Sequence, residues 1–266
     1  MTEHYLIRVP GCQRIRGAEL ISPIIRLAIV LHALCSLLFA LSGEEVIKKV
    51  DENTVVGSIS YSAKMVISFG GKIREKEFKG FVQGEERAYM EFTAPARDKG
   101  TRFLKINDEM WIYIPSVEKA TKIAGHMLRQ SMMGSDFSYD DVVENEKLLE
   151  LYEVELVGSD SVNDRKTYKL QLTAKVDEVN YFFRTVWVDK ETYIPVKTEL
   201  YAKSGKLMKE VMVVDFQKID GYNYPTRIIM VNKLRKDTYT ELFLEQIQLD
   251  AIVPKKVFTK AYLERK

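Results

Sequence analysis

The segment Arg97–Val143, RDKGTRFLKINDEMWIYIPSVEKATKIAGHMLRQSMMGSDFSYDDVV, decides the fold of this chain. Its first half predicts two short strands, residues 101–106 and 110–114, which are joined by a turn. The run WIYI at 111–114 is apolar at every position, so we expect this strand to be covered on both of its faces. From Ala124 on the strand pattern stops, and a flexible Met-rich run begins that ends in an acidic cluster. Such an insert in a β-protein indicates a surface suited to apolar ligands, because methionine adapts to varied partners.

Strand signals surround this segment on both sides. Residues 59–69 alternate apolar and polar side chains, which predicts a long half-buried antiparallel strand, and Gly70–Gly71 predicts a hairpin turn. Similar signals continue to Leu249 and give about ten to twelve strands. A short helix is predicted at Glu44–Asn53, with Ser42 and Glu45 as its capping box. The sequence therefore predicts a mainly β (α+β) fold, with one antiparallel sheet curved into a barrel or half-barrel that the helical pieces cover.

The first 42 residues differ from the rest of the chain. Residues 27–41 read LAIVLHALCSLLFAL, an uncharged apolar run after Arg26, with small residues before a cleavage position at Ser42. This pattern predicts a secretory (Sec-type) signal peptide and a periplasmic protein; the alternative is an uncleaved membrane anchor. We therefore divide the chain into 1–42, an N-terminal extension with the signal peptide, and 43–266, a single domain.

Composition excludes several classes of function. The net charge of the chain is +2, and residues 43–266 carry 36 basic and 36 acidic side chains, which argues against nucleic acid as a partner. Both cysteines lie in the first 42 residues, so the predicted domain has no disulfide and no thiol chemistry. His126 is its single histidine, and no motif for a metal, a nucleotide or a catalytic triad occurs. We predict no enzymatic activity and no cofactor.

The Met-rich run supplies the candidate binding residues. Either these side chains plug the barrel as core, or they form a lid over a ligand, and a plug that swings out would do both. The lid candidates are Met127, Leu128, Met132, Met133 and Phe137, with Gly125 and Gly134 as hinges. Trp111 and Tyr113 are expected beneath the lid, and Met65, Ile67, Met90 and Phe92 are weaker candidates for the cavity wall. The acids Asp136, Asp140 and Asp141 are interpreted as a solvated helix start rather than a calcium site.

Six runs of the sequence resemble a known family. They are residues 97–116, KATKI at 119–123, LRQSMMGSDFSYDDV at 128–142, and the later runs 187–211, 224–232 and 258–263. Together they look like the LolA-like outer-membrane lipoprotein-sorting proteins, in the branch often associated with RND-type exporters. The central motif is specific, whereas the later strands alone would be weak evidence.

The resemblance implies a half-open antiparallel β-barrel with a helical lid over an apolar cavity. It also implies a periplasmic carrier that binds lipid or lipoprotein acyl chains and delivers them toward the outer membrane. No cargo-contacting residue transfers position by position from the family. The alternative function is an envelope sensor or an interaction module that binds an RND-type exporter or a membrane acceptor protein.

Overall fold

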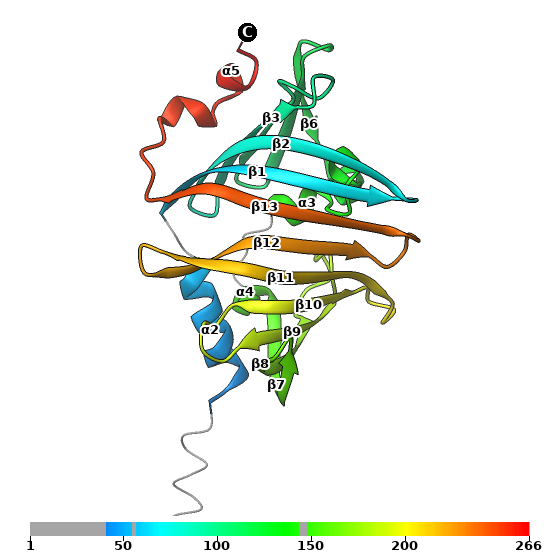
Figure 1. The fold of residues 1–266 in the computed structure, drawn as a ribbon, viewed down its shortest axis with the longest axis vertical. Helices are drawn as coiled ribbons and strands as arrows, with labels where there is room; N and C mark the ends of the chain where they lie inside the picture. Colours follow the sequence, from blue (N-terminus) through cyan, green and yellow to red (C-terminus); the bar gives the residue numbers. More distant parts are fainter. Residues whose placement is uncertain (1–40, 55–56, 144–147, 266) are drawn as a thin grey trace, which may run out of the picture. The chain divides into compact units, whose positions relative to one another are not determined.

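The computed structural model describes residues 41–54, 57–143 and 148–265, and these contain one curved antiparallel sheet of thirteen strands (Figure 1). The strands are β1 (Ser58–Phe69), β2 (Lys72–Gln83), β3 (Arg87–Ala94), β4 (Arg102–Ile106), β5 (Glu109–Ile114), β6 (Lys119–Ile123), β7 (Tyr152–Val162), β8 (Arg165–Ala174), β9 (Phe183–Asp189), β10 (Pro195–Tyr201), β11 (Leu207–Ile219), β12 (Tyr222–Asn232) and β13 (Thr238–Leu249). The predicted mainly β fold is confirmed, although the number of strands exceeds the predicted ten to twelve.

The strand order shows two meanders, the first made of β1–β6 and the second of β7–β13, which meet where β1 pairs with β13. The order across the sheet is β6-β5-β4-β3-β2-β1-β13-β12-β11-β10-β9-β8-β7. The chain therefore passes from one edge strand, β6, to the opposite edge strand, β7, through the Met-rich segment. In that passage lie η1 (Gly125–Arg129), η2 (Met132–Gly134), α3 (Tyr139–Val143) and α4 (Leu148–Leu151). We call residues 124–143 the insert.

The longer strands explain one difference from the predicted sheet. The polar composition of residues 158–165 predicts a turn over this whole range, but β7 continues to Val162 and β8 begins at Arg165. The turn itself needs only Asn163 and Asp164, both at positive φ, as a two-residue hairpin turn requires. Polar side chains there are exposed strand residues, so composition alone misplaced the turn.

The N-terminal helix α2 (Gly43–Thr54) packs on the second meander. Its Val46, Ile47 and Val50 are buried, and the predicted capping box is confirmed: the Ser42 backbone amide donates to Glu45 (2.8 Å) and the Glu45 amide to Ser42 Oγ (3.1 Å). A Cβ on Gly43 would lie 3.0 Å from a β7 backbone nitrogen, so glycine permits this close approach.

The two faces of the first meander are both covered. The face that carries Met65 and Phe92, here called the inner face, packs under the insert, while the outer face carries Tyr89 and Leu104. The chain's last segment, η3 (Lys255–Phe258) and α5 (Lys260–Leu263), covers the outer face with buried Phe258. Figure 1 shows α3 behind β13 and α5 at the other side of the sheet.

The structure divides the chain into two units, residues 1–41 and 42–266, and all elements above belong to the second. The predicted signal peptide lies almost entirely in residues 1–40, outside the described residues, so it and the 42/43 boundary stay predictions. Within the described residues, no helix combines the length and the apolar character that crossing a membrane requires.

Candidate ligand-binding face

The inner face of the sheet is an apolar surface rich in sulfur and aromatic side chains. Its buried members are Ala63, Met65, Ile67, Phe78, Met90, Phe92, Phe103, Met110, Ile123 and Met230, and Met132 and Phe137 of the insert pack on them. They come from both meanders, because β12 carries Met230. The face is therefore continuous across the β1–β13 junction.

The insert buries its apolar side chains against this face. Met132 is fully buried, Phe137 is 7% exposed, and Leu128 and Met133 pack partly buried against the same cluster. Met127 differs, because it is 44% exposed and lies outside the cluster. Four of the five lid candidates thus meet the four wall candidates Met65, Ile67, Met90 and Phe92; whether any of them binds a ligand stays a prediction.

The predicted position of Trp111 and Tyr113 beneath the lid is wrong. Both belong to the outer cluster with Phe258 and Leu263, because side chains alternate along β5 and Met110 and Ile112 take the inner positions. The ammonium of Lys260 in α5 lies 3.4 Å from the centre of the Trp111 ring. The prediction that this strand is covered on both faces is confirmed, but the larger side chains face the C-terminal segment.

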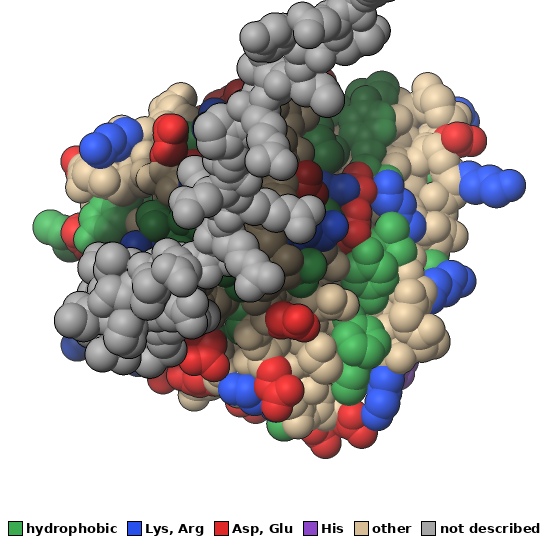
Figure 2. Space-filling model, turned by 90° about the horizontal axis from the view of Figure 1, so that it is seen from below, with side chains coloured by type: hydrophobic (Ala, Val, Ile, Leu, Met, Phe, Trp, Pro, Cys, Tyr) green, Lys and Arg blue, Asp and Glu red, His purple; other side chains and the backbone are tan. Residues whose placement is uncertain are grey.

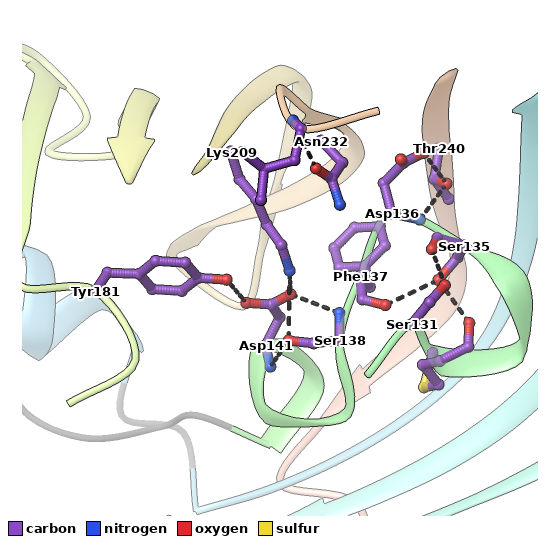
Figure 3. Close-up of polar contacts among 12 residues, drawn as sticks. Ser131, Ser135, Asp136, Phe137, Ser138, Asp141, Tyr181, Lys209, Asn232 and Thr240 are labelled. Carbon is purple, nitrogen blue, oxygen red and sulfur yellow. Dashed lines mark hydrogen bonds and ion pairs between the residues drawn. The ribbon is translucent and has the colours of Figure 1, made fainter. Parts of the chain in front are cut away.

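A buried carboxylate fixes the middle of the insert to the sheet (Figure 3). Asp136 accepts hydrogen bonds from the hydroxyls of Thr238 (2.8 and 3.0 Å) and Thr240 (2.8 Å), and its backbone amide donates to Thr240 Oγ1 (2.8 Å). The Arg235 guanidinium lies 4.0 Å away. Since an ionised carboxylate is costly to bury without partners, these contacts hold the insert at the start of β13.

A second buried carboxylate fixes the end of the insert. Asp141 forms an ion pair with Lys209 of β11 and accepts a hydrogen bond from the Tyr181 hydroxyl at 2.7 Å. It also caps α3, because the Ser138 amide donates to Asp141 (2.6 Å) and the Asp141 amide donates to Ser138 Oγ (3.3 Å). The interpretation of the acidic cluster as a solvated helix start is therefore wrong for Asp136 and Asp141, whose side chains are buried, although a short helix, α3, does begin at Tyr139.

Hydrogen bonds within the insert give it a fixed loop between these anchors. The Met132 amide donates to the Phe137 carbonyl (2.8 Å), and the buried Ser135 hydroxyl donates to the Met132 carbonyl (2.7 Å). Gly134 has φ +80°, where an L side chain is strained. Burial raises the pKa of Tyr139, whose ring lies 5.7 Å from that of Phe103, so the phenol stays neutral.

A cavity of about 390 Å³ opens between the insert and the second meander. Its lining includes the cations Arg129, Lys209 and Arg235 together with Asp136 and Phe137. Phe137 belongs both to the lining of this cavity and to the apolar cluster of the inner face. Within the described residues no group of three or more His, Cys, Asp or Glu side chains is arranged to hold a metal, and His126 is exposed.

The anchors were missed by sequence reasoning. Nothing in the sequence pairs Asp136 with threonines 102 and 104 residues later, or Asp141 with Lys209. A signal did exist for Met110 and Ile112, because successive side chains of a strand point to opposite faces, which separates these two residues from Trp111 and Tyr113. That pattern defines two sets but does not say which set faces inward.

Solved structures identify the class of fold. A DUF1329 family protein from Desulfovibrio piger is 25% identical, with a TM-score of 0.78 over 83% of this chain and 97% of that one. A LolA superfamily protein from Nitrosomonas europaea is also 25% identical, with a TM-score of 0.70 over 84% of this chain and 100% of that one. A domain assigned as an outer membrane lipoprotein-sorting protein from Vibrio parahaemolyticus is 22% identical, with a TM-score of 0.76 over 84% and 98%. The chain therefore has the LolA-like fold.

The family itself follows from a sequence model. Residues 84–265 match the model of a family whose description reads "-like: Uncharacterized protein". The chain belongs to that family. No curated protein matches the chain by sequence.

Proposed function

We propose that this protein is a periplasmic, non-enzymatic carrier that binds lipoprotein acyl chains or lipids on the inner face, beneath the insert, and delivers them toward the outer membrane. The observation that carries the proposal is the apolar inner face, whose cover is a loop of short helical turns rather than a strand or a long helix. Relatives described as LolA superfamily and lipoprotein-sorting proteins support the cargo class.

The energetics of such a carrier are favourable. Each methylene group that an acyl chain buries contributes about 0.8 kcal/mol, so a chain of ordinary length has ample driving force. The opposing cost is the free energy needed to displace Met132 and Phe137, because they occupy the positions that the acyl chain would take. The insert keeps the unloaded face from being an exposed apolar patch, which would promote aggregation.

The location in the proposal rests on two supports. One is the predicted signal peptide in residues 1–42, and the other is the outer-membrane role named for the Vibrio parahaemolyticus relative. The partner proteins of such a carrier are a donor and an acceptor of the cargo, and the candidates are an RND-type exporter and a membrane acceptor protein.

The direct test is to purify the protein from its producing cells and analyse its organic extract by mass spectrometry. The proposal expects a co-purifying acyl-chain compound at near-stoichiometric amount, and reversible binding of a fluorescent fatty acid after delipidation. Absence of both would overturn it. A stable complex with an envelope protein, without lipid transfer between vesicles, would instead support the sensor or interaction module.

A disulfide lock tests whether the insert is the lid. Thr240 Oγ1 lies 2.8 Å from both the amide and a carboxylate oxygen of Asp136, so Asp136→Cys with Thr240→Cys places two thiols on side chains that are in direct contact. The background carries serine at Cys12 and Cys35. Oxidation should lower fatty-acid uptake at least roughly 10-fold, and reduction should restore it.

The matched control is a second disulfide that leaves the insert untouched. Ser60 pairs directly with Gln248 in the β1–β13 ladder, so Ser60→Cys with Gln248→Cys links two strands of the same sheet. This variant should take up the fatty acid equally well in both redox states. Uptake that persists in the oxidised Asp136/Thr240 variant would remove the insert from the entry path.

A further inference from the structure

Two hairpin turns lie side by side at one end of the sheet. Phe69 of β1 pairs with Thr238 of β13, and the Gly70 amide donates to the Asp237 carbonyl at 3.0 Å. The turn between β1 and β2 therefore packs against the turn between β12 and β13 (Figure 1). We call residues 69–74 and 232–239 the hairpin tip.

Exposed apolar side chains are concentrated in the hairpin tip. Of the eleven large hydrophobic residues that are most exposed in the described chain, four lie in these 14 residues: Ile73 (54%), Leu234 (46%), Phe69 (44%) and Tyr239 (40%). Tyr239 and Ile73 flank Ser68 on the outer face, because both pair with it across neighbouring ladders. Beside them a surface groove of about 890 Å³ is lined by Ile229, Val231 and the two turns.

The hairpin tip is also strongly basic, in contrast to the rest of the protein. It carries five cations, Lys72, Arg74, Lys233, Arg235 and Lys236, and one acid, Asp237. Residues 43–266 as a whole have equal numbers of acidic and basic side chains, so the remainder of that region is net acidic. Figure 2, a view from below, shows Lys and Arg side chains at several places around the edge of the molecule, the right-hand edge among them.

Most of these cations are free to meet a partner. Within the described residues Lys72, Arg74 and Lys236 form no ion pair, and Lys233 reaches Glu210 only at 3.4 Å. Arg235 lies 4.8 Å from the Phe69 ring and so links the charged and apolar parts of the tip. Long basic side chains can keep their charges at a polar layer while the apolar side chains between them go deeper.

From this arrangement we propose that the hairpin tip docks the protein on an anionic lipid bilayer. Phe69 lies on the inner side of β1, and Ile73 and Tyr239 lie on the outer side, so apolar side chains occupy both faces of the same edge. A flat protein partner would cover one face, whereas the interfacial layer of a membrane surrounds an inserted edge. Basic residues around an apolar core are the composition that binds anionic headgroups.

A tryptophan at the tip tests the proposal in the full chain. The protein has only Trp111 and Trp187, both away from the tip, so Leu234→Trp adds a local probe. With vesicles of phosphatidylcholine and brominated phosphatidylglycerol, we expect this variant to show quenching and a blue shift that the unmodified protein lacks. The signal is the difference between the Leu234→Trp variant and the unmodified protein, so any quenching of Trp111 or Trp187 that follows from anchoring by residues 1–42 is common to both and cancels.

The control probe is Val157→Trp, since Val157 is comparably exposed (52%) but lies on the edge strand β7. It should show no added quenching. Equal quenching of both probes, or no added quenching at Leu234→Trp, would overturn the proposal.

Charge variants test the lipid class. Lys72→Ala with Lys236→Ala should raise the lipid concentration for half-maximal quenching of the Leu234→Trp probe by about 25-fold, since each surface cation contributes about a 5-fold preference. Lys48→Ala with Lys166→Ala removes the same charge from exposed positions outside the tip and should leave that concentration unchanged. Equal quenching by vesicles of brominated phosphatidylcholine alone would overturn the anionic requirement. The result is independent of fatty-acid uptake, which reports on the inner face.

Discussion

Strand β5 has two covers, one on each face, and they are built on different principles. On the inner face the insert places Met132 and Phe137 over the sheet and is fixed by two buried carboxylates. On the outer face the C-terminal segment is fixed by buried apolar side chains, Phe258 and Leu263 among them. Its charged contacts lie at the partly exposed rim, where Arg265 pairs with Glu91 at 2.7 Å.

The two kinds of attachment suit the proposed roles, in which the inner cover opens as a lid and the outer cover stays closed. Apolar packing is lost gradually, in proportion to the area that separates. A buried ion pair and its hydrogen bonds hold one geometry strongly, and water replaces them once that geometry is left. The inner cover is thus fixed at discrete points, and the outer cover is fixed along its length.

The largest expected effect comes from breaking an inner anchor. Lys209→Met leaves the buried Asp141 carboxylate without its cation and should lower the free energy of unfolding by about 4 kcal/mol, measured by urea denaturation. The matched control is Lys203→Met, which breaks the exposed pair with Asp177 and should change stability by less than about 0.5 kcal/mol. Equal small losses in both would show that the anchor does not stabilise the insert.

A cavity under the outer cover should have the next largest effect. Leu263 is fully buried, so Leu263→Ala should cost about 3 kcal/mol and loosen α5. Trp111 lies under this segment, so its fluorescence emission should shift to the red. Met132→Ala removes a similar volume beneath the insert and should leave that emission unchanged, since Trp111 is on the other face. A red shift in both variants would contradict the separation of the two covers.

The stabilisation that the charged rim of the outer cover contributes should depend on pH. Burial acts to raise the pKa of Glu91, but Arg265, Lys79 and Arg102 outweigh it and hold the pKa below its ordinary value. The stabilisation is therefore present above the ordinary glutamate pKa of about 4.3 and is lost as the pH falls through the lowered value.

Glu91→Gln measures this contribution. The substitution should destabilise the protein by about 1 kcal/mol at pH 7, an amount limited by solvent screening. The difference from the unmodified protein should shrink as the pH falls below about 4. A difference that does not change between pH 7 and pH 3 would assign the effect to packing rather than charge.

The smallest expected effect concerns the proposed hinge at the start of the insert. Gly125 has φ +56° and open space around its Cβ position, so Gly125→Ala should cost only about 1 kcal/mol of backbone strain. Gly84→Ala, at φ +57° in the turn after β2, is its matched control. Both should lose similar stability, but only Gly125→Ala should slow fatty-acid uptake. Equal rates of fatty-acid uptake in the Gly125→Ala and Gly84→Ala variants would show that Gly125 is not a hinge.

The fold followed from the sequence because alternation is local. Residues 59–69 and the glycine turn after them specify β1 and its hairpin without reference to any distant residue. The capping boxes at Ser42 and Ser138 were likewise readable, because each depends on residues three apart. The same holds for the insert, whose departure from strand pattern at Ala124 marks its beginning.

The site was less predictable because it depends on distant contacts. Alternation separates Trp111 from Met110 but is silent about which cover each will meet. Burial also limits how the lid can be tested: Met132→Asp would place a charge at a fully buried position and unfold the protein, so it cannot report on the lid. Only the structure shows that Asp136 and Asp141 hold the insert, because their partners lie on β13 and β11.

The strand order also has a consequence for how the chain folds. Of the twelve ladders of the described sheet, only β1–β13 joins strands that are not consecutive, and it pairs Ile59 with Leu249. Each meander can form from neighbouring hairpins, and the loss of chain entropy from long-range closure falls on one late step. The insert contacts Phe103 in the first meander but is tied through Asp136 and Asp141 to the second. The insert can therefore dock only after the two meanders have paired through β1 and β13. The apolar inner face is thus covered only in molecules that have completed folding.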